Sequence, residues 1–194
     1  RKMSVYIDDL ILMDAINGDE ITRIELGDKF RNKFKNPYAV VHRGDLHGVF
    51  LNACKENNLI EMSTNTNIIS YEQNSNGVFA ISDDGNKING IALIGAEGLW
   101  SKIRAQLVGD GPPKVSGHTT YRSVIPIDQM PEELRWNAAT LWAGPKCHIV
   151  HYPIHGGKSF NLVVTYHNDA LEPVAGKPDS YTHLRAHETR SYLV

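Results

Sequence analysis

The sequence has 194 residues, and 20 Lys and Arg against 22 Asp and Glu give a formal net charge of −2. This near neutrality argues against a nucleic-acid partner and against a polybasic membrane anchor. Hydrophobic residues make up 41% of the chain and charged residues 22%, as in ordinary globular proteins. No run approaches the roughly 20 apolar residues of a membrane span, and no apolar signal core follows the first residues, so a cytoplasmic protein is expected.

The two cysteines, Cys54 and Cys147, are far apart and belong to different patterned segments. Neither a Cys-x-x-Cys metal site nor a disulfide framework is indicated. Both are expected to be small buried hydrophobic residues.

The first part of the chain reads as strands and one helix. Residues 8–26 alternate apolar and polar around Asn17-Gly18, which predicts an antiparallel hairpin. A polar stretch follows at 29–37, and a helix is predicted from about residue 45 to Asn57. Residues 60–88 contain short apolar runs between turn signals, which predicts a small meander.

The run Ile91–Ile94 is short and apolar, and it leads through a Gly-rich turn to a helix capped by Ser101. This pattern predicts a fully buried strand, then a turn, then a helix. Free backbone N–H groups at that helix start would suit a phosphate. A tight structural connection between strand and helix explains the same spacing equally well.

Gly109-Asp110-Gly111-Pro112-Pro113 is the strongest break in the chain, and a lobe boundary is predicted there. The lobe beyond it is predicted to be mostly antiparallel sheet with one short helix. The expected strands are 119–125, 140–143, 146–152 and 159–167, and the expected helix is 131–134.

Three histidines, His148, His151 and His155, have a spacing that would align metal ligands on a helix. Pro153 and the alternation around it indicate a strand instead, which places His148 and His151 on opposite faces. No metal site is therefore predicted. His148 and Tyr152 share one face. Near the first helix, Arg43 could reach a phosphate or a carboxylate, although a solvated helix start is the simpler interpretation.

Four segments together resemble the central part of the flavin-dependent aromatic hydroxylases. They are Arg43-x-Asp45-Leu46, residues 93–104, residues 120–126 and residues 134–153. The last segment is similar to the 3-hydroxybenzoate 6-hydroxylase branch, close to the salicylate hydroxylases. The likeness extends over about residues 5–177.

The resemblance implies a monooxygenase that uses FAD, NADH or NADPH, and dioxygen to hydroxylate an aromatic acid such as 3-hydroxybenzoate (to gentisate) or salicylate. It implies that His148 is the base toward the phenol and that Tyr152 lies near the aromatic ring. It also implies cofactor contacts, which are Arg43, Gly95, Ala96, Glu97, Gly98, Ser101 and Arg104. Glu97 departs from the aspartate usual in the family, and its extra methylene moves the carboxylate by about 1.5 Å.

The implied fold is α/β (α+β). A fragment of a Rossmann-like FAD-binding domain is expected over residues 1–110, joined to a mostly antiparallel β-sheet substrate domain over 111–178. Residues 179–194 resemble translated sequencing-adaptor DNA and are expected to be a non-native tail.

The sequence has no G-x-G-x-x-G near its start and no later Gly-Asp segment. We therefore expect the middle of a parent enzyme about twice as long, with the fragment inactive alone and the parent compatible with a homo-oligomer. A second interpretation stays open at this point, namely a non-catalytic ligand-binding or interaction module derived from such a flavoprotein.

Overall fold

The computed structural model describes residues 3–168, and these form two compact units. The larger unit combines residues up to 53 with those from 115 onward, and the smaller unit contains residues 54–114. This division differs from the lobes expected from the sequence, because the N-terminal residues group with the C-terminal sheet. The expected non-native tail, 179–194, lies outside the described residues.

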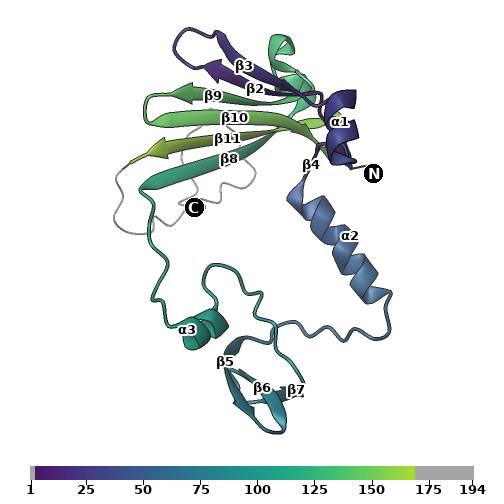
Figure 1. Cartoon of the computed structure of the whole chain (residues 1–194), viewed down its shortest axis with the longest axis vertical. Helices are drawn as coiled ribbons and strands as arrows, with labels where there is room; N and C mark the ends of the chain where they lie inside the picture. The colour runs from purple at the N-terminus through teal and green to yellow at the C-terminus, as the bar shows by residue number, and fades with distance from the viewer. Residues whose placement is uncertain (1–2, 169–194) are drawn as a thin grey trace. The chain divides into compact units, whose positions relative to one another are not determined.

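A six-stranded sheet forms the larger unit (Figure 1). Its strands in spatial order are β3 (Glu20–Glu25), β2 (Asp9–Asp14), β9 (Ala138–Gly144), β10 (Cys147–Ile154), β11 (Ser159–His167) and β8 (His118–Pro126). Neighbours are antiparallel except β2 and β9, which run parallel. This parallel register, from Asp9↔Ala138 to Asp14↔Ala143, joins the N-terminal hairpin to the C-terminal strands and explains why the units divide as they do.

The predicted hairpin at 8–26 and the predicted C-terminal strands are confirmed. Gly18 turns the β2–β3 hairpin with a φ of 83°, a conformation that glycine adopts without steric cost. One face of the sheet carries a hydrophobic cluster of Ile11, Met13 and Ala138, packed by Trp136 and Trp142. Alternation along β2 places these apolar side chains on one face.

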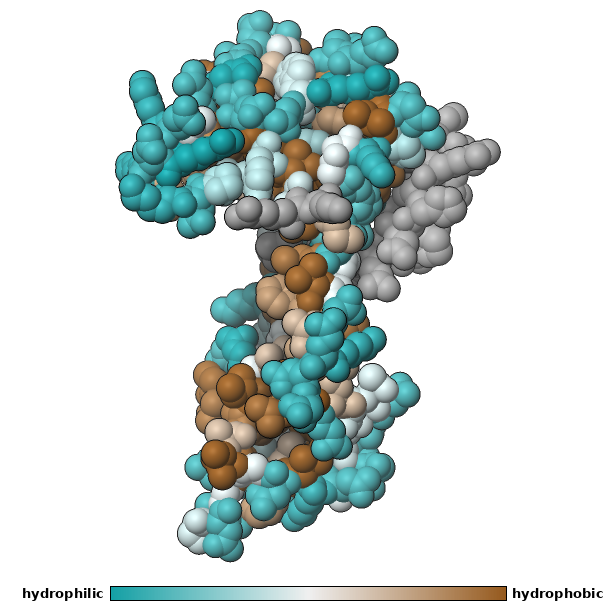
Figure 2. Space-filling model, turned by 90° about the vertical axis from the view of Figure 1, so that its right-hand side faces the viewer, coloured by the Kyte–Doolittle hydropathy of each residue, from teal (hydrophilic) through white to brown (hydrophobic). Residues whose placement is uncertain are grey.

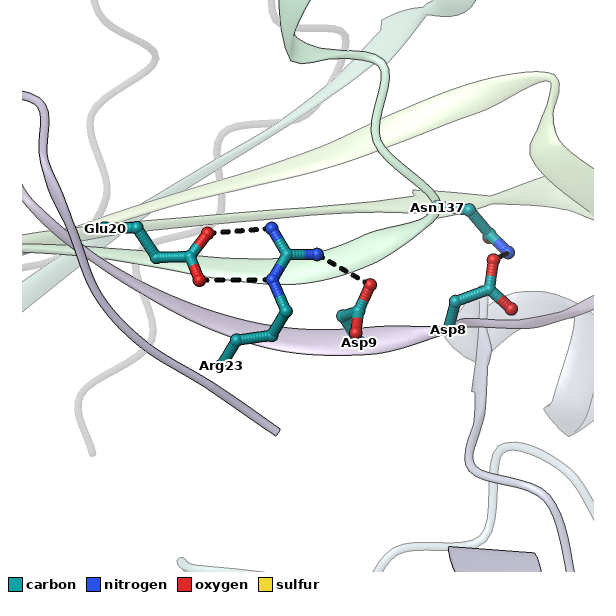
Figure 3. Close-up of polar contacts among 5 residues, drawn as sticks. All are labelled: Asp8, Asp9, Glu20, Arg23 and Asn137. Atoms are coloured by element: carbon teal, nitrogen blue, oxygen red, sulfur yellow. Dashed lines mark hydrogen bonds and ion pairs between the residues drawn. The ribbon is translucent and has the colours of Figure 1, made fainter. Parts of the chain in front are cut away.

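Charged side chains line the edge of the sheet at β3 (Figure 3). Arg23 forms a two-pronged contact with Glu20, with Nη2–Oε2 at 2.7 Å and Nε–Oε1 at 3.1 Å, and its Nη1 lies 2.8 Å from Asp9 Oδ2. Nearby, Asn137 Nδ2 donates to Asp8 Oδ2 at 2.8 Å. Charge on an edge strand discourages pairing with another chain, and every residue of β3 is exposed.

Short elements complete the larger unit. A two-stranded sheet pairs β1 (Ser4–Tyr6) with β4 (Ala39–Val41), and the helices are α1 (Asp28–Phe34) and α2 (Arg43–Lys55). Three 3-10 turns are η1 (Ile127–Gln129), η2 (Glu132–Leu134) and η3 (His155–Gly157). The predicted helix at 131–134 is thus a 3-10 turn, and α2 begins two residues before its predicted start.

Helix α1 lies in a stretch that the sequence marked only as polar. It buries no side chain, so no amphipathic period reveals it. The Phe30 and Phe34 rings contact each other one turn apart, tilted by 40° with centroids at 4.5 Å, and such an i, i+4 contact supports a short helix locally.

The smaller unit is the predicted meander with a helix against it. Its strands are β5 (Ile68–Asn74), β6 (Gly77–Ser82) and β7 (Lys87–Gly90), and its helix is α3 (Lys102–Val108). Gln106 holds α3 to β5, because its side chain accepts from Tyr71 N at 3.0 Å and donates to Tyr71 O at 2.7 Å. Ile103 is the buried residue of α3.

The prediction of a buried strand at 91–94 is wrong. These residues have no regular secondary structure, and Ile91 and Ile94 are almost fully exposed, at 103% and 86%. An isolated apolar run becomes a strand only when a neighbour pairs with its backbone, and no described strand does so here. Figure 2 shows apolar side chains on the surface of the smaller unit, to which this run belongs.

The expectation of two buried cysteines is also wrong. Cys147 is exposed and Cys54 is half-buried. Cys147 opens β10 directly after the tight turn from β9, at the rim of the sheet where little covers a side chain. Among the helices of the described residues, none is long and apolar enough to cross a membrane.

Candidate functional site

An open depression of about 310 Å³ lies on one face of the large sheet. Its lining residues are Ser116, His118, Thr120, His148 and Thr165. The lining side chains are polar and can both donate and accept hydrogen bonds. One of them, His148, belongs to the His148–Tyr152 pair that the sequence singled out. The depression can therefore hold a small ligand with hydroxyl or carboxyl groups.

Three adjacent strands position the floor of this depression. His148 of β10 is opposite Thr165 of β11, which is in turn opposite Thr120 of β8. The Thr120 and Thr165 hydroxyls are hydrogen-bonded at 3.0 Å. Paired residues in antiparallel strands point to the same face, so this row of three side chains is fixed by register.

His118, which lines the depression, stacks on His167. His118 and His167 have ring centroids 4.7 Å apart, and His118 Nδ1 lies 3.1 Å from Ser116 O. Tyr152 lies four residues beyond His148 on the same face of β10, opposite Asn161, but it is not among the lining residues. The structure thus brings His148 into the depression and leaves Tyr152 further along the strand.

His151 occupies the other face of β10, as predicted. It is 2% exposed and packs among aromatic rings, with centroids of Trp136, Trp142 and Phe160 at 6.0, 6.4 and 6.1 Å. Burial lowers its pKa, because the charged imidazolium loses hydration there. This histidine is a core residue on the face of β10 opposite His148.

Arg43 is the first residue of α2 and is exposed. Sequence spacing placed its guanidinium just before the helix, and the structure places it within the first turn. Asp45 lies in the same turn, where its charge complements the helix dipole. Arg43 can reach an anion from this position.

The Gly95–Arg104 segment folds as a local hydrogen-bonded network in the smaller unit. Glu97 Oε1 accepts from the Lys102 backbone N–H at 3.2 Å, and Ser101 Oγ accepts from Arg104 N–H at 3.0 Å. The Ser101 hydroxyl donates to Glu97, and the Arg104 side chain pairs with Asp110. The cap by Ser101 is confirmed. The N–H groups at this helix start were expected to be free, but those of Lys102 and Arg104 already have side-chain acceptors.

Two positions of this segment, 95 and 98, favour glycine because of close packing and backbone conformation. A Cβ at Gly95 would lie 3.1 Å from Ile103 Cγ2, so glycine permits the loop to approach the helix. Gly98 has a φ of 79°, which favours glycine. Ala96 lies between them in irregular backbone.

The candidate residues divide between the two units. Arg43, His148 and Tyr152 belong to the larger unit, and the segment from Gly95 to Arg104 belongs to the smaller one. Sequence reasoning missed Thr165, Ser116 and His118. Thr165 is 45 residues from Thr120, and only the β8–β11 register reveals that they meet.

The comparisons with known proteins identify the relatives. A 3-hydroxybenzoate 6-hydroxylase from Aquipseudomonas alcaligenes is 53% identical over 178 residues, which cover 92% of this chain and 45% of that protein. By sequence, the chain is homologous to the 3-hydroxybenzoate 6-hydroxylases. The resemblance to flavin-dependent aromatic hydroxylases is thereby confirmed. The chain spans about half the length of the curated relatives it matches.

Solved structures show the same fold. Klebsiella pneumoniae HpxO, complexed with FAD and uric acid, matches with a TM-score of 0.71 at 19% identity, over 92% of this chain and 43% of that one. A salicylate hydroxylase in complex with its substrate matches with a TM-score of 0.67 at 16% identity, over 93% and 46%. The expected mixed α/β fold is confirmed. No family model matches the chain.

Proposed function

We propose that this chain forms part of an FAD-dependent monooxygenase that hydroxylates a phenolic acid, with 3-hydroxybenzoate or salicylate as the substrate class. The 53% identity to a 3-hydroxybenzoate 6-hydroxylase carries the proposal, and the depression around His148 supports it. NADH or NADPH would supply the electrons and dioxygen the inserted oxygen atom. A cytoplasmic location and a homo-oligomeric parent belong to the same proposal.

His148 is proposed as the base toward the substrate phenol. A phenolate is a better nucleophile than a phenol, and an imidazole nitrogen within hydrogen-bond reach of the hydroxyl can act as the general base that removes its proton. The strand holds His148 rigidly beside two paired threonine hydroxyls. These hydroxyls can orient a ligand oxygen next to the imidazole, and Tyr152 extends the same face toward the aromatic ring.

FAD, when bound, supplies the redox chemistry of oxygen activation. Arg43 fits an anionic cofactor, because it is exposed at the start of a 13-residue helix. A guanidinium binds phosphate through paired N–H donors.

The Gly95–Arg104 segment fits a pyrophosphate less directly. The Glu97 carboxylate already accepts the Lys102 N–H, and like charges repel. An anion at this turn requires Glu97 to release that contact. We therefore propose Gly95, Ala96, Glu97, Gly98, Ser101 and Arg104 as a cofactor segment that rearranges when a nucleotide binds.

The test is a His148→Ala variant of the intact enzyme that contains this chain, with His47→Ala as the control because His47 is exposed on α2. Hydroxylated product and substrate-stimulated NADH oxidation are measured together. We expect His148→Ala to lower product formation about 10²- to 10⁴-fold, the usual contribution of a general base, and to reduce NADH oxidation far less. Unchanged product formation would remove His148 from the mechanism.

Flavin content distinguishes the alternative module. An intact protein that carries no FAD and forms no hydroxylated product from either aromatic acid would support a ligand-binding or interaction module. Sequencing the source DNA across both ends of the reading frame shows whether nucleotide-binding segments flank the chain. Their presence would support the enzyme.

A further inference from the structure

Three side chains converge in the larger unit, and none of them lines the His148 depression. His42 follows β4, Asp45 lies in the first turn of α2, and His155 opens η3 after β10. His42 Nδ1 lies 3.9 Å from Asp45 Oδ1, and His155 Nε2 lies 3.8 Å from Asp45 Oδ2. One ligand atom from each residue lies within 4.8 Å of the other two.

The backbone around this cluster is arranged to bring the rings together. His155 has a φ of 52°, in the left-handed region that a non-glycine residue seldom adopts. At the other side, a Cβ on Gly44 would lie 3.0 Å from His42 Cε1 and 3.2 Å from His42 Nδ1. Glycine at 44 therefore makes room for the His42 ring, and the two imidazole centroids lie 4.4 Å apart.

The separations are too long for direct hydrogen bonds, which reach about 3.2 Å between nitrogen and oxygen. They are close to what an ion between the atoms requires. Zinc binds nitrogen and oxygen at about 2.0–2.2 Å, so two tetrahedral ligand atoms lie about 3.4 Å apart. One ligand atom from each residue lies within 4.8 Å of the other two, so side-chain rotations must shorten the longest of these separations by up to about 1.4 Å to reach that value.

The chemistry of the donor set selects the ion. Two imidazoles and one carboxylate suit zinc and similar transition metals, whereas calcium and magnesium prefer sites built from oxygen. The side chains of His42, Asp45 and His155 are 39%, 20% and 33% exposed, so water can reach the remaining coordination positions.

We propose that His42, Asp45 and His155 form a binding site for a divalent transition-metal ion, with Zn²⁺ as the representative ion and water as the remaining ligands. The sequence predicted no metal, because the series His148, His151 and His155 was assigned to a strand, where the side chains do not align. Its last member, His155, instead meets two residues more than 100 positions earlier in the chain. The proposal is independent of the hydroxylase activity.

Titration calorimetry with ZnCl₂ on the full 194-residue chain, stripped with EDTA, tests the site. We expect one Zn²⁺ to bind, and His155→Asn to weaken binding at least tenfold, since asparagine tolerates the backbone conformation but lacks the imidazole. His42→Ala is a second variant that leaves η3 untouched and should weaken binding equally. His47 lies on α2 with Asp45 but outside the cluster, so His47→Ala should leave Zn²⁺ binding unchanged.

Two further readouts make the result decisive. Co²⁺ in place of Zn²⁺ should give visible absorption bands that disappear in both cluster variants, and far-UV circular dichroism should show that each variant keeps its secondary structure. Absence of Zn²⁺ binding by the unmodified chain would overturn the proposal. So would unchanged binding in a folded His42→Ala/His155→Asn double variant, because the ion would then reside on other histidines.

Discussion

Replacing His151 by leucine should stabilise the protein, although it removes a residue from the centre of the sheet. His151 is 2% exposed, and neither ring nitrogen has a hydrogen-bond partner among the described residues. A buried polar group without a partner costs about 1–3 kcal/mol. Leucine is similar in volume, and such exchanges cost less than about 1.5 kcal/mol. We expect His151→Leu to raise the free energy of unfolding by about 1 kcal/mol at pH 8.

Lowering the pH should increase the difference in unfolding free energy between His151→Leu and the unmodified chain. Burial lowers the pKa of His151 in the folded state, whereas in the unfolded chain it keeps its ordinary value of about 6.5. Below that pH the unfolded chain takes up a proton that the folded chain resists, so the folded state loses stability as the pH falls. At pH 5, about 1.5 units below the pKa of the unfolded chain, this loss of folding free energy reaches at most about 2 kcal/mol. His151→Leu removes the loss entirely.

Urea unfolding followed by circular dichroism, at pH 8 and pH 5, measures both effects. His47→Leu is the matched control, because His47 is exposed and its replacement should change the free energy of unfolding by less than about 0.5 kcal/mol. A stability difference between His151→Leu and the unmodified chain that is the same at both pH values would refute the reasoning from burial. A large destabilisation at pH 8 would show that the imidazole has an essential partner.

Three further predictions concern the described fold. Phe160→Ala should lower the free energy of unfolding by about 3–5 kcal/mol because Phe160 is 2% exposed, whereas Phe50→Ala, at 64% exposure, should change it little in the same urea titration. Ser101→Ala removes the acceptor for the Arg104 N–H and should lower the stability of α3 by about 0.5–2 kcal/mol. Faster hydrogen exchange in α3 would show this loss, and unchanged exchange would count against the cap. Arg23→Met breaks exposed ion pairs and should shift the urea midpoint only slightly, and 0.5 M NaCl should largely abolish this shift.

The candidate site could be predicted from the sequence only in its local parts. Strand alternation placed His148 and Tyr152 on one face and His151 on the other, because the side-chain period of a strand is two residues whatever surrounds it. Ser101 was recognisable as a helix cap from its position before an amphipathic run. Partners that meet across strands, such as Thr120 and Thr165, could not be found in this way, since pairing depends on register.

The smaller unit shows where local patterns fail. The apolar run 91–94 has the composition of a buried strand, yet Ile91 and Ile94 are exposed because no described strand pairs with them. Glu97 accepts the Lys102 N–H at the start of α3, a contact that its position in the sequence does not reveal. In both cases the neighbours decide what the residue does.

By itself the sequence determined the hairpin at 8–26, the presence of a helix over about 45–57, the meander and the C-terminal strands, because turn chemistry and hydrophobic period act over a few residues. It also carried the family resemblance. Only the tertiary structure decided that β2 joins β9 in parallel, which draws the N-terminal residues into the C-terminal sheet. Long-range contacts of β1 and β4 with β10 and η3 bring His42 and Asp45 to His155. Contacts between residues more than 100 positions apart follow from packing and register, which no local pattern encodes.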